Sequence, residues 1–282
     1  MDMLISTEWL ADQLGAPDLA VLDASLHLPG AERDARAEFE SGQIPGARFL
    51  DLAGLHDPAS ALPGKVPDGD RIARWLGERG IGAQTRIVLY DDSQLRSAAR
   101  AWLLLDLAGL ANIAVLDGGL AKWKAEGRPL ESGSAMATAV GRPPTAVRVT
   151  DIRDKAAMLA NIDTRAEQVV DARDAGRFTG ADEDSVHDLP GGHIPGARNL
   201  FFRDVLREDG TFRDPEELRA QAERAGLDID QPIVASCGSG VTASVVLFAL
   251  RRAGASQTAL YDGSWSEWGA DPETPKETGE AR

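Results

Sequence analysis

The amino-acid sequence predicts an α/β protein built from two similar halves, each a parallel sheet with helices on both faces. Three observations support this prediction: several motifs occur twice in the same order, short apolar runs alternate with helical patterns, and a segment without apolar periodicity separates the two copies. A chain of 282 residues has room for two domains of ordinary size. The repeat therefore determines the expected architecture.

The repeat is clearest in a turn motif. Residues 42–47 read Gly-Gln-Ile-Pro-Gly-Ala, and residues 192–197 read Gly-His-Ile-Pro-Gly-Ala. Two further pairs keep nearly the same offset, namely residues 21–24 with 170–172 and residues 117–123 with 262–268. Matched landmarks in one order indicate that one structural unit is present twice.

Each copy contains a buried strand followed by a loop and a mostly apolar helix. The predicted strands cover residues 87–90 and 233–235, where β-branched and other apolar side chains follow one another. The predicted helices cover residues 98–107 and 242–252. Strands that alternate with helices pair in parallel and are covered on both faces, so an α/β fold is expected in each half.

We expect three segments along the chain: a first domain over residues 1–130, a linker over residues 131–146 and a second domain over residues 147–282. The linker is rich in Ser, Gly, Ala, Thr and Pro and has no apolar period. After Trp268 the chain becomes polar and contains prolines. This tail is expected to lie on the surface or to be poorly ordered.

Composition and charge exclude several classes of function. The net charge of −15 argues against a nucleic-acid partner, because phosphate binding needs a basic surface. No apolar run reaches the length of a membrane span and the first residues lack the basic flank of a secretory signal, so we expect no membrane association and a cytoplasmic location. The single cysteine cannot form an internal disulfide, and the four histidines show no metal-ligand spacing with it. We therefore expect no metal and no cofactor.

Cys237 is the candidate catalytic residue. It follows the apolar run of residues 233–235 and precedes the sequence Gly-Ser-Gly-Val-Thr-Ala, which leads into the predicted helix. Two glycines allow the backbone to curl so that N–H groups point inward, and the helix N-terminus adds partial positive charge. Such a loop stabilises anionic sulfur, which a nucleophilic cysteine requires. The alternative is a buried cysteine that only fills core space, and this setting argues against it.

A resemblance to the rhodanese superfamily becomes specific at this loop. Residues 237–243, Cys-Gly-Ser-Gly-Val-Thr-Ala, are similar to the active-site loop of its 3-mercaptopyruvate sulfurtransferases. The duplicated turns and residues 261–265, Tyr-Asp-Gly-Ser-Trp, resemble the same family. The resemblance implies two tandem rhodanese-like domains and a two-step cycle, in which Cys237 takes sulfur from a small donor as a persulfide and passes it on. The acceptor would be a thiol, such as thioredoxin or a small thiol, or cyanide.

The resemblance also implies roles for other residues. Backbone N–H groups would stabilise the outer sulfur of the persulfide, and they belong to Gly238, Ser239, Gly240, Val241 and Thr242. Ser239 would also orient the donor. Arg177, which precedes a phenylalanine, matches the family's substrate-binding arginine. A guanidinium suits a carboxylate or sulfonate because it donates paired hydrogen bonds.

The first copy is expected to be inactive. Asp91 occupies the position that corresponds to Cys237, and the loop over residues 91–96 has no glycine. An aspartate cannot hold a sulfane sulfur. The resemblance implies the same, since the family has an inactive first domain that packs against the second and helps to form the cleft.

Two positions depart from the family pattern. Many mercaptopyruvate enzymes have a second arginine where residues 184–187 here read Asp-Ser-Val-His, so that contact is missing or replaced. The family's proposed Ser–His–Asp relay would use Ser239, a histidine in the first Ile-Pro-Gly-Ala turn and Asp34, but the turn carries Gln43. Glutamine cannot relay a proton, so either water does this work or the relay is not needed.

Four other residues complete the predictions. Asp34 and Trp265 are further candidates for the site, Trp265 because it follows an Asp-Gly pair near the expected mouth of the cleft. Arg173 is expected to be structural. His193 is expected to be structural as well, because it belongs to a tight Pro-Gly turn.

Three rival functions are weighed against this one. A cysteine phosphatase or arsenate reductase needs an arginine six residues after the nucleophile, where this chain has Ala243. A non-catalytic rhodanese-like binding module would suit the first domain but would leave the Cys237 loop without a purpose. Thiosulfate rhodaneses usually place Arg-Lys after the cysteine, whereas this chain has the neutral pair Gly238-Ser239. 3-Mercaptopyruvate is therefore the expected donor, and thiosulfate is the alternative.

Overall fold

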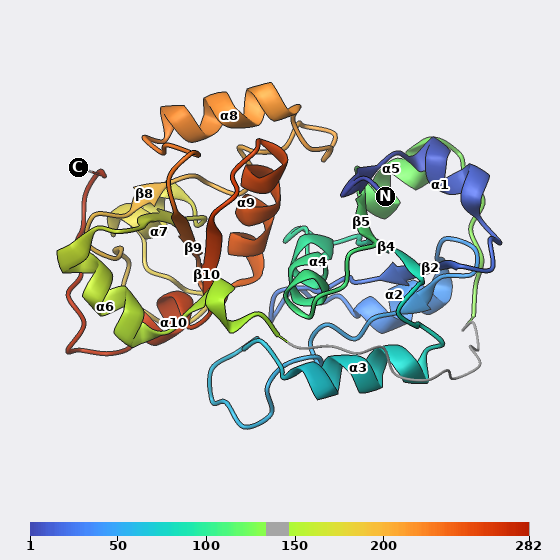
Figure 1. Ribbon diagram of the computed structural model, residues 1–282, viewed down its shortest axis with the longest axis horizontal. Helices are drawn as coiled ribbons and strands as arrows, with labels where there is room; N and C mark the ends of the chain where they lie inside the picture. The colour runs from blue at the N-terminus through green and yellow to red at the C-terminus, as the bar shows by residue number, and fades with distance from the viewer. Residues whose placement is uncertain (134–146, 282) are drawn as a thin grey trace. The chain divides into compact units, whose positions relative to one another are not determined.

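Two parallel sheets, each of five strands, form the framework of the protein (Figure 1). The computed structural model describes residues 1–133 and 147–281. Most of the expected linker, residues 134–146, therefore lies outside the described residues. The chain divides into two compact units.

The first half carries the first sheet. Its elements are β1 (Leu4–Ile5), α1 (Thr7–Gln13), β2 (Leu19–Asp23), α2 (Ala35–Ser41), β3 (Arg48–Phe49), α3 (Gly69–Glu78), β4 (Arg86–Tyr90), α4 (Ala98–Leu107), β5 (Ile113–Leu116) and α5 (Gly119–Ala125).

The second half carries the second sheet. Its elements are a 3-10 helix η1 (Val149–Asp151), β6 (Ile152–Arg153), α6 (Lys155–Thr164), β7 (Gln168–Asp171), α7 (Ala175–Thr179), β8 (Arg198–Asn199), α8 (Pro215–Arg224), β9 (Ile233–Ser236), α9 (Val241–Arg252), β10 (Thr258–Tyr261) and α10 (Ser264–Trp268).

The two sheets have the same topology, which confirms the predicted α/β fold and its duplication. Strand order is β1-β5-β4-β2-β3 in the first and β6-β10-β9-β7-β8 in the second, and every pair is parallel. Replacing each strand of the first list by its counterpart in the second half gives the second list. In parallel sheets all strands end at the same edge, so the loops after β7, β9 and β10 meet there.

Unit 2 consists of Pro58–Lys65, Val149–Arg207 and Phe212–Arg282, and unit 1 consists of Met1–Asp57, Val66–Arg148 and Glu208–Thr211. Each unit thus takes a short segment from the other half of the sequence. The segment Pro58–Lys65 belongs to the same unit as the Cys237 loop.

The helices of unit 2 cover both faces of its sheet. Helix α9 lies on one side of β9 and β10, whereas α6 and α10 lie on the other (Figure 1). The core on the second side contains Tyr261, Trp265 and Trp268, all fully enclosed. Burial of large aromatic side chains stabilises this layer by the hydrophobic effect. It also fixes α10 against the sheet behind Cys237.

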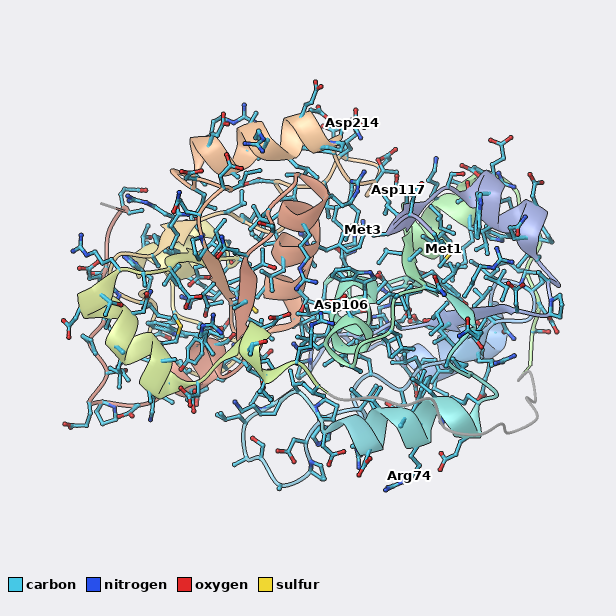
Figure 2. The ribbon with its side chains drawn as sticks, in the orientation of Figure 1. Met1, Met3, Arg74, Asp106, Asp117 and Asp214 are labelled. Atoms are coloured by element: carbon cyan, nitrogen blue, oxygen red, sulfur yellow. The ribbon has the colours of Figure 1, made fainter. Side chains whose placement is uncertain are left out.

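The helices have polar N-caps and one exposed side, as expected for helices at the surface. Asp154 and Asp174 cap α6 and α7, each accepting a hydrogen bond from a backbone N–H of the first turn. In unit 1, α3 buries Ile72 and Leu76 while Arg74 points away from the ribbon (Figure 2). This alternation is the pattern of a half-buried helix. Among the residues that the structure describes, no helix is long and apolar enough to cross a membrane.

Candidate active site

Cys237 lies immediately after β9, at the start of a loop that leads into α9. Gly240 has a φ of 83° and precedes the helix, a conformation that favours glycine. This turn brings the N–H of Gly240 to 3.1 Å from Sγ of Cys237, to which it donates. Cys237 is only 2% exposed, so the thiol lies at the base of the loop. Helix α9 starts at Val241, and its first N–H groups have no partner within the helix.

Residues of α10 are hydrogen-bonded to the backbone of the Cys237 loop. The N–H of Trp265 donates to the carbonyl of Cys237 at 2.9 Å, and the N–H and hydroxyl of Ser266 donate to the carbonyl of Gly238 at 2.9 and 2.8 Å. The N–H of Cys237 donates to Oγ of Ser264 at 3.3 Å. These bonds engage the carbonyl oxygens that follow β9. Negative ends of the peptide dipoles are thereby held away from the sulfur, which leaves the loop suited to an anion.

The segment Pro58–Lys65 reaches the same loop. A Cβ added to Gly64 would lie 3.3 Å from the carbonyl oxygen of Ser239, so the two backbones pack closely. Nζ of Lys65 lies 3.5 Å from Oδ2 of the buried Asp262, which follows β10. Residues from the first half of the sequence thus line the loop within unit 2.

Arg173 is a buried cation close to the sulfur. Its guanidinium donates to both carboxylate oxygens of Asp171 and to the carbonyl of Gly192, and it stacks 4.4 Å above the ring of Trp265. Burial alone would lower the pKa of Arg173, but the charges of Asp171, Asp184 and an ionised Cys237 raise it. The attraction between Arg173 and the thiolate is mutual, so this cation favours anionic sulfur. The side chain of Arg173 is fully buried.

Asp184 connects three basic side chains. Its Oδ2 lies 3.5 Å from Nη1 of Arg173, and its Oδ1 lies 3.5 Å from Nη1 of Arg177 and 3.0 Å from Nδ1 of His187. Burial would raise the pKa of Asp184, but the hydrogen bond and charge of His187 and the charges of both arginines lower it to about 2. Asp184 is therefore ionised at neutral pH and orients its three neighbours.

Arg177 lies on α7, on the exposed side of this network. Its Nε donates to Asp174 at 2.7 Å, and its side chain is 21% exposed. The guanidinium has five N–H donors, so its contacts with Asp174 and Asp184 leave other N–H groups available for a ligand. Arg177 is thus both anchored and accessible, as binding of an anion requires.

His187 is the residue of this region that sequence reasoning did not assign. A Cβ added to Gly238 would lie 2.8 Å from Nδ1 and 2.9 Å from Nε2 of His187, so the imidazole covers the residue that follows Cys237. The turn over residues 184–189 holds it, because Asp184 and Leu189 form an antiparallel bridge. An Asp-x-x-His pattern after a candidate substrate-binding arginine was the available signal.

Trp265 and Asp34, the two further candidates, have local partners. Trp265 is 1% exposed, and its Nε1–H donates to the carbonyl of Pro190, so it supports the turn that carries His187. Asp34 lies in unit 1, where its carboxylate accepts hydrogen bonds from Arg36 and Ala37 and caps α2. Of the other loop residues, Gly238 and Ser239 precede the N-cap Gly240, and Val241 and Thr242 are the first two residues of α9.

The repeated turns form scaffold contacts in both units. His193 is buried, stacks on Phe178 with ring centroids 3.9 Å apart, and pairs its backbone with Glu277. Gln43 pairs in the same way with Glu131 and donates to the carbonyl of Gly133. The two turns thus make equivalent bridges, and the tail after α10 runs along the surface to supply one of them.

Asp91 in unit 1 follows β4 as Cys237 follows β9. Its carboxylate accepts hydrogen bonds from the N–H groups of Ser93 and Ala98, at 2.9 and 2.8 Å, and its carbonyl accepts from Leu120. The last bond corresponds to the one from Trp265 to Cys237. The carboxylate therefore fills the turn that holds the sulfur in unit 2.

Ionisation of Asp184 is expected to stabilise the fold at neutral pH. Its pKa is about 2 in the folded protein against an ordinary value of 3.8, so the contribution is present above about pH 5 and is lost as the pH falls through the folded value. The difference amounts to about 2 kcal/mol. Urea unfolding of the wild type and of Asp184→Asn, from pH 7 down to pH 3, measures it. The gap between the two proteins should narrow at low pH, and a constant gap would contradict the assignment.

Comparisons with known proteins identify relatives over nearly the whole chain. The model of the rhodanese-like domain matches twice, over residues 6–126 and 154–271. A 3-mercaptopyruvate sulfurtransferase from Homo sapiens is 39% identical over 276 residues, covering 94% of this chain and 91% of the relative. A thiosulfate sulfurtransferase from Cricetulus griseus is 37% identical over 285 residues, covering 96% and 94%. The crystal structure of a 3-mercaptopyruvate sulfotransferase from Escherichia coli matches with a TM-score of 0.83 at 34% identity, covering 94% of this chain and 99% of that one.

Proposed function

The chain belongs to the rhodanese family as a tandem-domain sulfurtransferase, and on that basis we propose that it moves sulfur from 3-mercaptopyruvate to a thiol or cyanide through a persulfide on Cys237. The observation that carries this proposal is the loop after β9. It places one sulfur atom under an N–H group at 3.1 Å, beside the start of a helix and next to a buried cation. These groups all favour negative charge on sulfur.

The first half-reaction transfers one sulfur atom. The thiolate of Cys237 attacks the sulfur of 3-mercaptopyruvate, the carbon–sulfur bond breaks, and its electron pair passes to the enolate of pyruvate, which takes up a proton. The cysteine is left as a persulfide. Backbone N–H groups from Gly238 to Thr242 would stabilise its outer sulfur, and Ser239 would orient the donor.

The second half-reaction regenerates the cysteine. A thiol such as thioredoxin or a small thiol, or cyanide, attacks the outer sulfur, and the Cys237 thiolate leaves. Because the cysteine is almost fully enclosed, the persulfide sulfur is the atom that extends toward the acceptor. These two half-reactions need no cofactor, because the cysteine itself carries the sulfur.

Two features favour 3-mercaptopyruvate as the donor. Gly238 and Ser239 add no charge beside Cys237, which suits a donor whose charge is a carboxylate some atoms away from the sulfur. Arg177 supplies an accessible guanidinium for that carboxylate. The relative from Homo sapiens is named for the same donor.

Thiosulfate as the main donor is the second candidate, since the relative from Cricetulus griseus is named a thiosulfate sulfurtransferase. Thiosulfate carries two negative charges next to its sulfur, and the neutral loop offers them no side-chain cation. A non-catalytic module is the third candidate, in which Cys237 takes up no sulfur from any donor.

The first domain, residues 1–130, is proposed to carry no sulfur, and residues 147–282 are proposed to form the catalytic domain. Asp91 has its carboxylate bonded to two backbone N–H groups. An oxygen acid in this place cannot form a persulfide. One bound sulfur per chain is therefore the expected stoichiometry.

Steady-state kinetics with 3-mercaptopyruvate and with thiosulfate, combined with the intact mass after loading, tests these alternatives. We expect a mass increase of one sulfur atom and a higher kcat/KM for 3-mercaptopyruvate. A tenfold or greater preference for thiosulfate would establish the second candidate. A protein that gains no sulfur from either donor would be a binding module.

A further inference from the structure

We propose that His187 binds the anionic group of the sulfur donor together with Arg177, and does so in its protonated form. This inference rests on the proposed function, because it concerns the donor of the same site. Many mercaptopyruvate enzymes have a second arginine in this part of the sequence, and we infer that His187 takes over its contact with the donor.

His187 lies next to the nucleophile. Its imidazole lies against the backbone of Gly238, the residue directly after the nucleophile, at distances that leave no room for a Cβ. The side chain is 14% exposed, so it can be reached by a small molecule. A donor with its sulfur at Cys237 therefore lies beside this ring.

Asp184 fixes the orientation of the His187 imidazole. Asp184 is ionised and buried, and its Oδ1 lies 3.0 Å from Nδ1 of His187, so Nδ1–H donates to the carboxylate. The second bond of the turn, from the N–H of His187 to the carbonyl of Asp184 at 3.0 Å, fixes the backbone as well. Nε2 is thus the nitrogen left for a ligand, and it donates only when the ring is protonated.

Several charged groups surround His187. The groups that face it or its immediate partners are the carboxylates of Asp171, Asp174 and Asp184, the guanidiniums of Arg173 and Arg177, and the thiolate of Cys237. These anions outnumber these cations before any donor binds. An anionic donor adds further negative charge, and a positive charge on His187 would offset part of it.

Gly238 and His187 form a matched pair. Any side chain at position 238 would displace the imidazole, because its Cβ would fall within 3 Å of both ring nitrogens. An Arg-Lys loop of the thiosulfate type therefore cannot coexist with His187 in its present place. Because Gly238 has no side chain, His187 can lie beside the loop. The positive charge for an anion would then come from the neighbouring turn and not from the loop itself, as it does in an Arg-Lys loop.

The test measures KM for 3-mercaptopyruvate between pH 6 and 8 in the wild type, His187→Gln and His187→Arg. We expect the wild-type KM to rise with pH, since histidine loses its charge in this range. His187→Gln should raise KM about tenfold at pH 6, the usual weight of one charged hydrogen bond, and remove most of the pH dependence of KM. His187→Arg should keep a low KM that changes little across the range.

Val186→Ala is the matched control, because this neighbour in the same turn is exposed and its side chain carries no charge and no hydrogen-bonding group. It should leave KM and its pH profile unchanged. Circular dichroism and sulfur loading at saturating donor confirm that each variant is folded and competent.

Two failures can be told apart. If the wild type takes up no sulfur on Cys237 from 3-mercaptopyruvate, the proposed function is wrong. If the wild type takes up sulfur but His187→Gln shows the same KM and pH profile, the role of His187 is overturned. An equal loss in His187→Gln and His187→Arg at every pH would also overturn it, because charge would then be irrelevant.

Discussion

Replacing Cys237 by serine is expected to lower sulfur transfer at least about 100-fold while the protein stays folded. Oxygen cannot form the persulfide, whereas the exchange of Sγ for Oγ is nearly isosteric and keeps an acceptor for the N–H of Gly240. Cyanide-dependent turnover with 3-mercaptopyruvate and with thiosulfate measures the loss, and thermal unfolding checks the fold. Residual activity above about one per cent of the wild type would sink the covalent route.

Chemical modification of the wild type provides the control for this variant. The chain has a single cysteine, so iodoacetamide can alkylate only Cys237 and should inactivate the enzyme completely. Loading with donor beforehand should slow the reaction, because the thiolate is then masked as a persulfide. Absence of protection would count against a stable persulfide.

The elements nearest the site could be predicted from sequence because their signals are local. The helix expected over residues 98–107 has these bounds as α4, and the one expected over residues 242–252 begins one residue earlier as α9. Strands β4 and β9 each extend one residue beyond the predicted runs. Continuous apolar runs and helical periodicity are readable within a few residues, and the duplication checks each assignment against its counterpart.

The contacts within the site could not be predicted in the same way, because they join distant parts of the chain. Gly238 lies in the loop after β9, whereas His187 lies in the turn between α7 and β8, and Lys65 comes from the first half of the sequence. Trp265 illustrates the same limit. Its position after an Asp-Gly pair suggested the mouth of a cleft, but its ring is enclosed between Arg173 and the carbonyl of Pro190.

Replacing Arg177 by alanine is expected to raise KM for 3-mercaptopyruvate by about 30- to 150-fold with a smaller change in kcat. The loss corresponds to about 2–3 kcal/mol, the usual scale for a charged hydrogen-bond partner. The structure supports this magnitude, because Asp174 and Asp184 hold the guanidinium in place before the donor arrives. Little entropy is then lost on binding. Arg219→Ala is the matched control, since it removes an exposed arginine of α8 in the same unit.

Replacing Arg177 by lysine separates charge from geometry. Lysine keeps the positive charge but not the planar pair of donors, so only part of the affinity should return. It also cannot donate to Asp174 and to a donor carboxylate from fixed directions, as the guanidinium can. Full recovery would mean that charge alone binds the donor. Unchanged KM in Arg177→Ala would place the carboxylate elsewhere in the site, and comparison with His187→Gln would then show whether the turn over residues 184–189 binds it without Arg177.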